Sequence, residues 1–403
     1  MNKSYLEKLR FNELYTMSSG ISSTKEQAGH GYPFVSFSTI FNNFFLPEQL
    51  PDLMDTSDKD RENCSVLEGD VFLTRTSETP DELAMSCVSL KNYTNATFSG
   101  FAKRLRPINK GLTYPKYMAF YLRSPYFRKV INNNTIMTLR ASFNEDMFSF
   151  LNLYLPKYEE QVKIGDLLYL IEKKIQLNEQ INNNLEQQAM SLYDYWFTQY
   201  NFPDIDSKPY KLNGGILIYN NILKRNIPKD WIVAPISEHT NIYQPQTISN
   251  ELFNETYNYE VYGGGGLIGR YFEYNHKESE VIISCRGNCG NFYFTSPKSW
   301  ITGNAMVVNP KDKNLSKYYL YHYFMRYGVK QYLSGSVQKQ LTRENLSIMN
   351  IVIPPKNILE AFDKIIKPIF DEILNHKLEI TKLNRLKNWL LPLLMNGQAT
   401  IKE

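Results

Sequence analysis

The sequence has few cysteines and no long apolar run. Only four cysteines occur in 403 residues, so a disulfide framework is not expected. The longest apolar stretch, WLLPLLM at 389–395, falls far short of the roughly 18 residues that a membrane span needs. The first residues, MNKSYLEKLRFNELY, lack the apolar core of a secretory signal. We therefore expect a cytoplasmic protein that has no membrane partner.

Patterns typical of catalysis and metal binding are also missing. No GxxxxGK[ST] phosphate loop occurs, which argues against an ATP site of that kind. The Pro-Pro pair in IPPKN (353–357) lacks the flanking acidic or amide residue and the aromatic residue of an adenine methyltransferase. Cys285 and Cys289 have zinc-like spacing, but no second pair stands nearby. We predict no catalytic residues, no metal and no cofactor.

Acidic residues are absent from one long stretch and almost absent from a second. Residues 83–144 contain no Asp or Glu but ten basic residues, and 281–343 contain one acid, Asp312, and nine basic residues. Residues 48–82, by contrast, hold eleven acids and three bases, so the net charge of +4 conceals the clustering. Each basic stretch is a candidate footprint for a polyanion such as DNA. The alternative is a solvated surface that acidic neighbours balance.

The chain repeats itself at a shift of about 200 residues. PKYMAFYLRS (115–124) aligns with SKYYLYHYFM (316–325), and LYLP (153–156) aligns with IVIP (351–354). A short apolar run stopped by proline is typical of a strand that leads into a helix. We predict two globular units, each ending in such a strand and followed by a helix.

The two predicted helices are long and share a heptad pattern. Residues 159–197 and 357–394 each form a segment near 38 residues with few helix breakers, equivalent to roughly 57 Å of helix. Their apolar stripes predict an antiparallel coiled coil in which the polar residues at the centre, Asn178 and His376, meet. The alternative is two independent amphipathic helices. The predicted pairing positions are Ile164, Ile171, Asn178, Leu185, Phe362, Ile369, His376 and Leu383.

Candidate DNA-binding residues in the first unit follow its apolar strands. In VFLTRTSETP (71–80), an apolar strand leads into small hydroxyl side chains around one guanidinium, which suits phosphate or the O6/N7 edge of guanine. The alternative is a polar hairpin tip that has no partner. The motif KRLR (103–106) is a phosphate-contact candidate, with a solvated strand as its rival. The predicted residues are Thr74, Arg75, Thr76, Ser77, Lys103, Arg104, Arg106 and Arg140.

The second unit offers three corresponding motifs. YGGGGLIGRY (262–271) has four consecutive glycines, which permit close backbone approach to a ligand. VIISCRGNCGN (281–291) ends an apolar strand with an arginine and an asparagine, and SGSVQKQLTREN (334–345) supplies amides suited to adenine and cations suited to phosphate. The predicted residues are Gly264, Gly265, Arg270, Arg286, Asn288, Gln338, Lys339, Gln340 and Arg343.

These motifs, with EGDVFLTRTSETPDELAMS (68–86) and the linker ending NIPKDW (226–231), resemble the specificity subunit of type I restriction-modification systems in order and spacing. The resemblance covers nearly all 403 residues. It implies two target recognition domains that read the unlike halves of a split DNA sequence, and helices that set the gap and dock methyltransferase subunits. It also implies no catalysis by the chain itself. The implied partners are double-stranded DNA and two methyltransferase subunits; whether a nuclease or translocase subunit takes part is left open.

We therefore predict a mixed α/β fold with a pseudo-twofold internal repeat. The predicted segments are a first target recognition domain at 1–157, a central spacer helix at 158–200, a linker at 201–228, a second domain at 229–355, a C-terminal spacer helix at 356–397 and a tail at 398–403. Two other functions stay open at this point, namely a structural scaffold that does not read DNA and a fused DNA methyltransferase.

Overall fold

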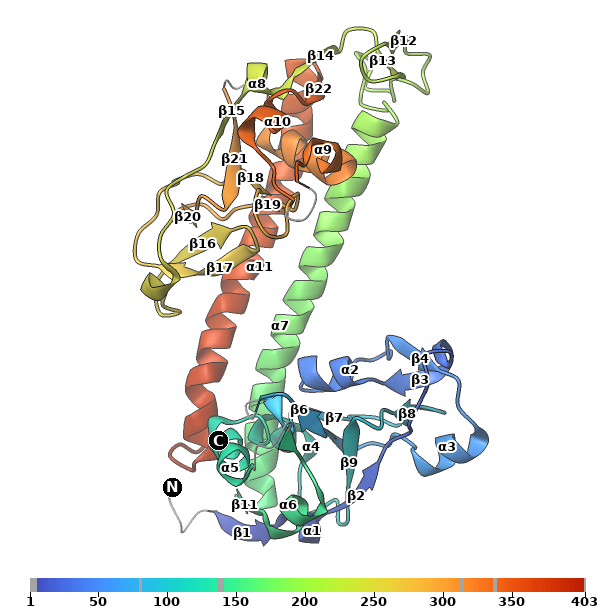
Figure 1. The fold of residues 1–403 in the computed structure, drawn as a ribbon, viewed down its shortest axis with the longest axis vertical. Coiled ribbons are helices and arrows are strands. Elements are labelled where there is room, and N and C mark those ends of the chain that lie inside the picture. Colours follow the sequence, from blue (N-terminus) through green and yellow to red (C-terminus); the bar gives the residue numbers. More distant parts are fainter. Residues whose placement is uncertain (1–5, 80–81, 136–140, 312–314, 336–338, 402–403) are drawn as a thin grey trace. The chain divides into compact units, whose positions relative to one another are not determined.

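The protein consists of two compact units (Figure 1). The computed structural model describes residues 6–79, 82–135, 141–311, 315–335 and 339–401. Unit 1 contains Met1–Asn178 and Glu379–Glu403, and unit 2 contains Glu179–Leu378. Each unit therefore combines a globular domain with one part of each long helix.

Unit 1 is built around an antiparallel sheet with the strand order β2-β9-β5-β7. The central strand β5 has the sequence VFLT and is buried along its whole length, as its apolar composition predicts. The sheet strands are β2 (Tyr15–Ser19), β9 (Ala102–Pro107), β5 (Val71–Thr74) and β7 (Ser86–Val88). The other pairings are β4 (Asp52–Met54) with β3 (Ala28–Val35) and β8 (Thr97–Phe98), β1 (Glu7–Arg10) with β11 (Asn152–Leu155), and β6 (Thr76–Ser77) with β10 (Ala141–Ser142).

Short helices cover this sheet. The buried aromatic residues of α4 and α5 join the same core as β5 and β9. The short helices of this domain are α1 (Phe11–Leu14), α2 (Phe37–Asn42), α3 (Asp58–Asn63), α4 (Pro115–Tyr121), α5 (Pro125–Asn134) and α6 (Glu145–Phe150), and α3 buries no residue.

Unit 2 repeats this topology, which confirms the internal repeat. Its main sheet has the order β15-β21-β18-β19, formed by β15 (Thr240–Tyr243), β21 (Ala305–Pro310), β18 (Val281–Ser284) and β19 (Phe292–Phe294). The smaller sheet is β17 (Gly266–Tyr271), β16 (Tyr259–Gly263) and β20 (Trp300–Ile301), and β14 (Ile232–Pro235) pairs with β22 (Asn350–Ile353). The α-helices of its globular domain are α8 (Ile236–His239), α9 (Lys317–Tyr327) and α10 (Arg343–Ser347). The segment predicted as a linker contains the hairpin β12 (Leu217–Asn220) and β13 (Arg225–Pro228).

The two long helices are present as predicted. Helix α7 (Tyr158–Tyr193) has 36 residues and continues as a short π-helix, η2 (Asp194–Thr198), while α11 (Lys356–Met395) has 40 residues. Each follows the last strand of a globular domain after a proline, as the repeated LYLP and IVIP motifs indicate. No helix among the described residues is long and apolar enough to cross a membrane.

Cross-helix contacts within each unit show that α7 and α11 pair antiparallel. In unit 1, Lys387 Nζ lies 2.7 Å from Glu172 Oε2, and Asn178 Nδ2 donates to Glu379 Oε2 at 2.8 Å. In unit 2, His376 Nδ1 lies 2.9 Å from Asn182 Oδ1. The antiparallel pairing is thus confirmed, but the predicted contact between Asn178 and His376 is wrong. A heptad stripe identifies the contacting face but not the axial stagger, and the predicted stagger was displaced by about one helical turn.

Burial along the predicted stripe is uneven, and the fully buried positions include Asn178 at the middle of α7. Ile164 and Phe362 are fully buried, each in the core of its own unit, and Ile171 is nearly so. Leu185, Ile369 and Leu383 are half-buried. The helices therefore pack both on each other and on the domains.

A buried histidine connects α9 to both long helices in unit 2. The His322 ring stacks on Tyr193 of α7 at 5.7 Å between centroids and meets Phe370 of α11 edge-on at 5.7 Å. Burial among these rings lowers the pKa of His322 to about 4. His322 therefore stays neutral in the folded protein at pH values where it is protonated in the unfolded chain.

We expect the free energy of unfolding of unit 2 to fall as the pH drops from about 6.5 to about 4, by up to about 3 kcal/mol from this residue. The unfolded chain binds a proton in that window and the folded unit does not. Urea unfolding followed by tryptophan fluorescence at pH 7 and pH 5 measures the effect. The variant His322→Phe should show a smaller loss, and an unchanged pH dependence in this variant would contradict the assignment.

Candidate nucleic-acid interface

In unit 1, the end of β5 brings three distant segments together. The Arg75 backbone N–H donates to Phe101 O at 2.8 Å, and Arg75 O accepts from Phe143 N at 2.8 Å. The Arg75 side chain is exposed and has no hydrogen bond or ion pair with another described residue. Arg75 thus lies at an exposed sheet edge, as its place after an apolar strand predicts.

The neighbouring hydroxyl residues differ in exposure. Thr74 is fully buried, and its Oγ1 donates to Glu82 O at 3.1 Å and accepts from Met85 N at 2.9 Å. Ser77 is buried and hydrogen-bonds Glu82 Oε2 at 3.3 Å. Thr76 is half-buried in β6. The Thr74 and Ser77 hydroxyls therefore hold the loop in shape, and Arg75 and Thr76 are the residues here that can face a ligand.

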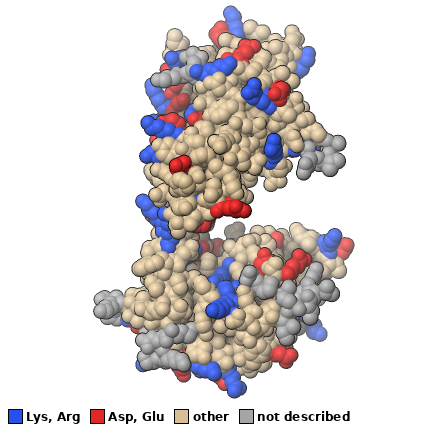
Figure 2. All heavy atoms as spheres, turned by 60° about the vertical axis from the view of Figure 1, so that its left-hand side comes forward, with Lys and Arg blue, Asp and Glu red and all other residues tan. Residues whose placement is uncertain are grey.

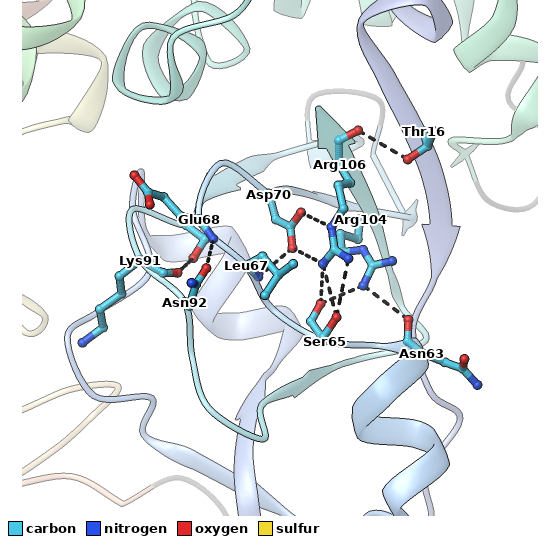
Figure 3. Close-up of polar contacts among 11 residues, drawn as sticks. Thr16, Asn63, Ser65, Leu67, Glu68, Asp70, Lys91, Asn92, Arg104 and Arg106 are labelled. Carbon is cyan, nitrogen blue, oxygen red and sulfur yellow. Dashed lines mark hydrogen bonds and ion pairs between the residues drawn. The ribbon is translucent and has the colours of Figure 1, made fainter. Parts of the chain in front are cut away.

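The prediction that KRLR contacts phosphate is corrected by the structure, because all three cations lie on strand β9 with partners within unit 1. Lys103 and Arg104 are buried and Arg106 is half-buried. Figure 3 shows the polar contacts of Arg104 and Arg106. Arg106 forms a bidentate pair with Asp70, with Nε–Oδ1 and Nη2–Oδ2 distances of 2.8 and 2.7 Å. Arg104 is 8% exposed and donates to Ser65 O at 2.7 Å, and burial lowers its pKa. Lys103 donates to Ser19 Oγ at 3.0 Å. These cations stabilise the fold of unit 1, because their partners come from segments that the motif itself does not contain.

Three other basic residues of the acid-free stretch 83–144 also have partners within unit 1. Lys91 pairs with Glu48 at 2.8 Å and Lys116 pairs with Asp166 at 2.8 Å. Arg123 donates to four backbone carbonyls, and burial lowers its pKa to about 10. On the face shown in Figure 2, basic and acidic side chains are interspersed. The lack of acids in this stretch of sequence therefore does not translate into a uniformly basic surface.

We expect Arg106→Ala to lower the free energy of unfolding of unit 1 by about 3 kcal/mol, because Asp70 would stay fully buried without its partner. Denaturant unfolding measures this loss. The matched control is Lys110→Ala, which removes an exposed cation from the same unit and should leave stability unchanged. Full stability combined with uniformly weaker DNA binding in Arg106→Ala would instead restore the phosphate-contact interpretation.

In unit 2, four predicted residues line one shallow pocket of about 410 Å³. The pocket is formed by Gly264, Gly265, Arg286, Gly287, Asn288 and Asn304. A Cβ atom added to Gly264 would lie 2.7 Å from Arg286 O, so this contact between the glycine-rich turn and the loop after β18 requires glycine. The Arg286 and Asn288 side chains are exposed and have no polar partner among the described residues. The pocket therefore presents the unpaired polar groups of Arg286 and Asn288 beside glycine backbone.

The segment around Lys339 lies beside this pocket. Leu341 N donates to Cys285 O at 3.2 Å, and Cys289 Sγ lies 2.8 Å from Lys339 O. Lys339, Gln340 and Arg343 are exposed. Arg270 is a partial exception to the prediction, because its guanidinium pairs with Glu260 at 3.5 Å on the same hairpin. Gln338, like Arg140 in the first unit, lies outside the described residues.

The second basic stretch retains more available cations than the first. Lys317 pairs with Glu280 at 2.9 Å and Arg326 with Asp194 at 3.1 Å. Five others are exposed, and none of them has a side-chain ion pair with another described residue: Arg286, Lys298, Lys330, Lys339 and Arg343. Among the described residues, the second basic stretch therefore offers more exposed cations without an ion pair than the first, and the polyanion footprint stays a prediction in both units.

Two residues that were not predicted occupy the same sheet edges. Asn304 lines the pocket of unit 2, and its carbonyl accepts from Cys285 N at 3.1 Å. Phe101 has the corresponding place in unit 1, where its carbonyl accepts from Arg75 N. A sequence signal exists, because FSGFAKRLRP (98–107) aligns with ITGNAMVVNP (301–310) at a shift of 203.

The cysteine pair near this pocket does not resemble a metal site. Cys285 is buried, which raises the pKa of its thiol, and its Sγ lies 3.1 Å from Gln244 Nε2. Within the part of the chain that the structure describes, no group of three or more His, Cys, Asp or Glu side chains could hold a metal ion.

Comparison with known proteins agrees with this arrangement. The family pattern for the type I restriction modification DNA specificity domain (Methylase_S) matches residues 9–187 and 228–388. The chain is 23% identical over 314 residues to the type I restriction enzyme MjaIX specificity subunit of Methanocaldococcus jannaschii, covering 70% of this chain and 67% of that protein. It is 21% identical over 447 residues to the type I restriction enzyme HindI specificity subunit of Haemophilus influenzae, covering 92% and 95%. A crystal structure of the type I restriction-modification system S subunit from M. genitalium has the same fold, with a TM-score of 0.61 at 13% identity over 98% of this chain and 97% of that one.

Proposed function

Because the chain belongs to the type I restriction modification DNA specificity family, we propose that it is the subunit that directs a type I methyltransferase to its DNA sequence. The observation that carries the proposal is a fold present twice with different exposed side chains at the same sheet edge. Arginine and amide side chains at such an edge suit guanine and adenine in the major groove. Two alternatives, a scaffold that does not read DNA and a fused methyltransferase, are distinguished from this function by mapping of DNA methylation.

In this proposal each unit reads one half of a split target. Unit 1 offers Arg75 and Thr76, and unit 2 offers Arg286, Asn288 and the segment from Lys339 to Arg343. Because these side chains differ, the two half-sites should differ in sequence. Arg140 and Gln338 remain candidates alongside them. The glycine-rich turn at Gly264 and Gly265 would let the DNA backbone or a base edge approach closely.

The paired helices are proposed to set the gap between the half-sites. Polar contacts at specific positions fix the stagger of paired helices, because a shifted register would leave the polar groups unpaired. The Glu172–Lys387 pair is buried, with both side chains about 10% exposed, and Asn182 bonds both His376 and the Ile373 carbonyl. These contacts favour a single axial register in each unit.

The chain is proposed to have no catalytic activity of its own and to act in the cytoplasm with methyltransferase subunits, two of them, on double-stranded DNA. A nuclease or translocase subunit would join the same assembly in a restricting system. The curated relatives support this role, since each is called a specificity subunit of a type I restriction enzyme.

The first experiment is methylation of a plasmid library by this chain co-expressed with its methyltransferase subunit, with modified adenines mapped by single-molecule sequencing. We expect a split motif with two unlike halves and a constant gap. Methylation without such a motif, or by this chain alone, would favour the fused enzyme. The absence of both methylation and DNA binding would favour a structural scaffold that does not read DNA.

Single substitutions then show which unit reads which half of the DNA target. We expect Arg286→Ala to weaken recognition of one half-site and Arg75→Ala the other, each by about 1 to 3 kcal/mol if the arginine contacts a base. Binding of the assembled complex to duplexes with single-base changes measures this selectivity. Lys229→Ala, which removes an exposed cation from unit 2, is the matched control. An equal loss on every duplex would refute base reading by these arginines.

A further inference from the structure

The equivalent turns SGFA (99–102) and TGNA (302–305) have the same construction in the two units. Ala102 N donates to Ser99 O at 2.9 Å, and Ala305 N donates to Thr302 O at 3.0 Å, so each tetrapeptide closes a tight turn before the sheet strand. Both alanines are fully buried. The third residue of each turn, Phe101 or Asn304, is therefore fixed between a closed turn and a buried anchor.

The glycine of each turn packs against the loop that follows the first strand of the main sheet. A Cβ atom on Gly100 would lie 2.9 Å from Ile21 O, and one on Gly303 would lie 2.8 Å from Pro245 O. Because this contact leaves no space for a side chain, the turn has little freedom to rotate. The side chain of the next residue is consequently directed outward at a set position on the sheet edge.

These outward side chains lie beside the exposed arginines. Phe101 is 66% exposed and is joined by its carbonyl to the backbone of Arg75. Asn304 is exposed and lines the pocket that contains Arg286 and Asn288. Phe101 makes no ring-to-ring contact with any described aromatic residue, so its ring adds little to the packing of unit 1.

We propose that Phe101 and Asn304 are equivalent specificity-determining residues, one for each half of the DNA target. This inference rests on the proposed function. An amide side chain pairs with adenine through N6 and N7, and an apolar side chain contacts the thymine 5-methyl group in the major groove. Phe101 would therefore select a thymine in the half-site of unit 1, and Asn304 an adenine in the half-site of unit 2.

The two assignments explain how one turn serves two unlike half-sites. The turn backbone, the glycine contact and the buried alanine are shared, while the single outward residue changes from an aromatic ring to an amide. An exchange at this position alters the chemistry offered to a base pair without changing the fold. The position is thus suited to changing specificity in one unit independently of the other.

The test for Phe101 uses the assembled complex with its methyltransferase and duplexes carrying the motif found by methylation mapping. Each thymine of the half-site that Arg75→Ala weakens is replaced in turn by deoxyuridine, which removes only the methyl group. We expect one position where this replacement weakens binding by about fourfold, the effect of one buried methyl group. In the Phe101→Ala complex that difference should vanish. Ile108→Ala, an exposed apolar residue beyond the opposite end of β9, should retain it.

The test for Asn304 replaces each adenine of the other half-site by 7-deazaadenine, which lacks the N7 acceptor. We expect one position where binding falls by at least about fivefold, and no such difference in the Asn304→Ala complex. Asn241→Ala, at the far end of the strand pair β15·β21, is the matched control.

The outcomes separate this inference from the proposed function. If the split motif is found but deoxyuridine and 7-deazaadenine discrimination survives in the two variants, the assignment of these residues is overturned while the function stands. An equal loss on all duplexes, or half-sites without thymine and adenine respectively, overturns it as well. If no split motif is found, the proposed function itself fails.

Discussion

The antiparallel pairing of α7 and α11 is the constraint on which both units depend. The C-terminal end of α11 supplies Leu391, Leu394 and Met395 to the core of unit 1, and the C-terminal part of α7 supplies Tyr193 to the core of unit 2. Each unit thus completes its hydrophobic core with residues of the long helix that follows the other globular domain in the chain. Burial of these side chains couples the folding of each domain to the helix pairing. The buried Glu172–Lys387 ion pair and the contact between Asn182 and His376 add polar contacts that fix the register of the paired helices.

A second constraint is the internal use of positive charge. In unit 1, Arg104, Arg106 and Arg123 are held by carbonyls and one buried carboxylate. A buried guanidinium must satisfy its donors inside the protein, since the loss of hydration is otherwise too costly. Those cations are therefore unavailable to a phosphate backbone. Unit 2 keeps more cations exposed, so the two units should rely on phosphate contacts to different extents.

Much of the architecture was predictable because its signals are local. The apolar runs before Pro156 and Pro354 identified the last strands, and the heptads identified the paired faces of the long helices. The axial stagger of α7 against α11 was not predictable, because similar side-chain packing positions recur at every turn of a coiled coil. The partner of Arg106 was not predictable either, since Asp70 lies 36 residues away on another segment. Phe101 and Asn304 were missed although the repeat at a shift of 203 places them together.

The repeat also explains why specificity can diverge while the fold does not. The positions that set the sheet edge are buried or lack side chains, as at Ala102, Ala305 and Gly303, so substitutions there disturb the backbone. The positions between them project from the protein and contribute little to its core. Replacement of these outward residues is therefore expected to cost little stability. In the proposed function, a duplicated scaffold with independently variable edges is the physical basis for two unlike half-sites in one chain.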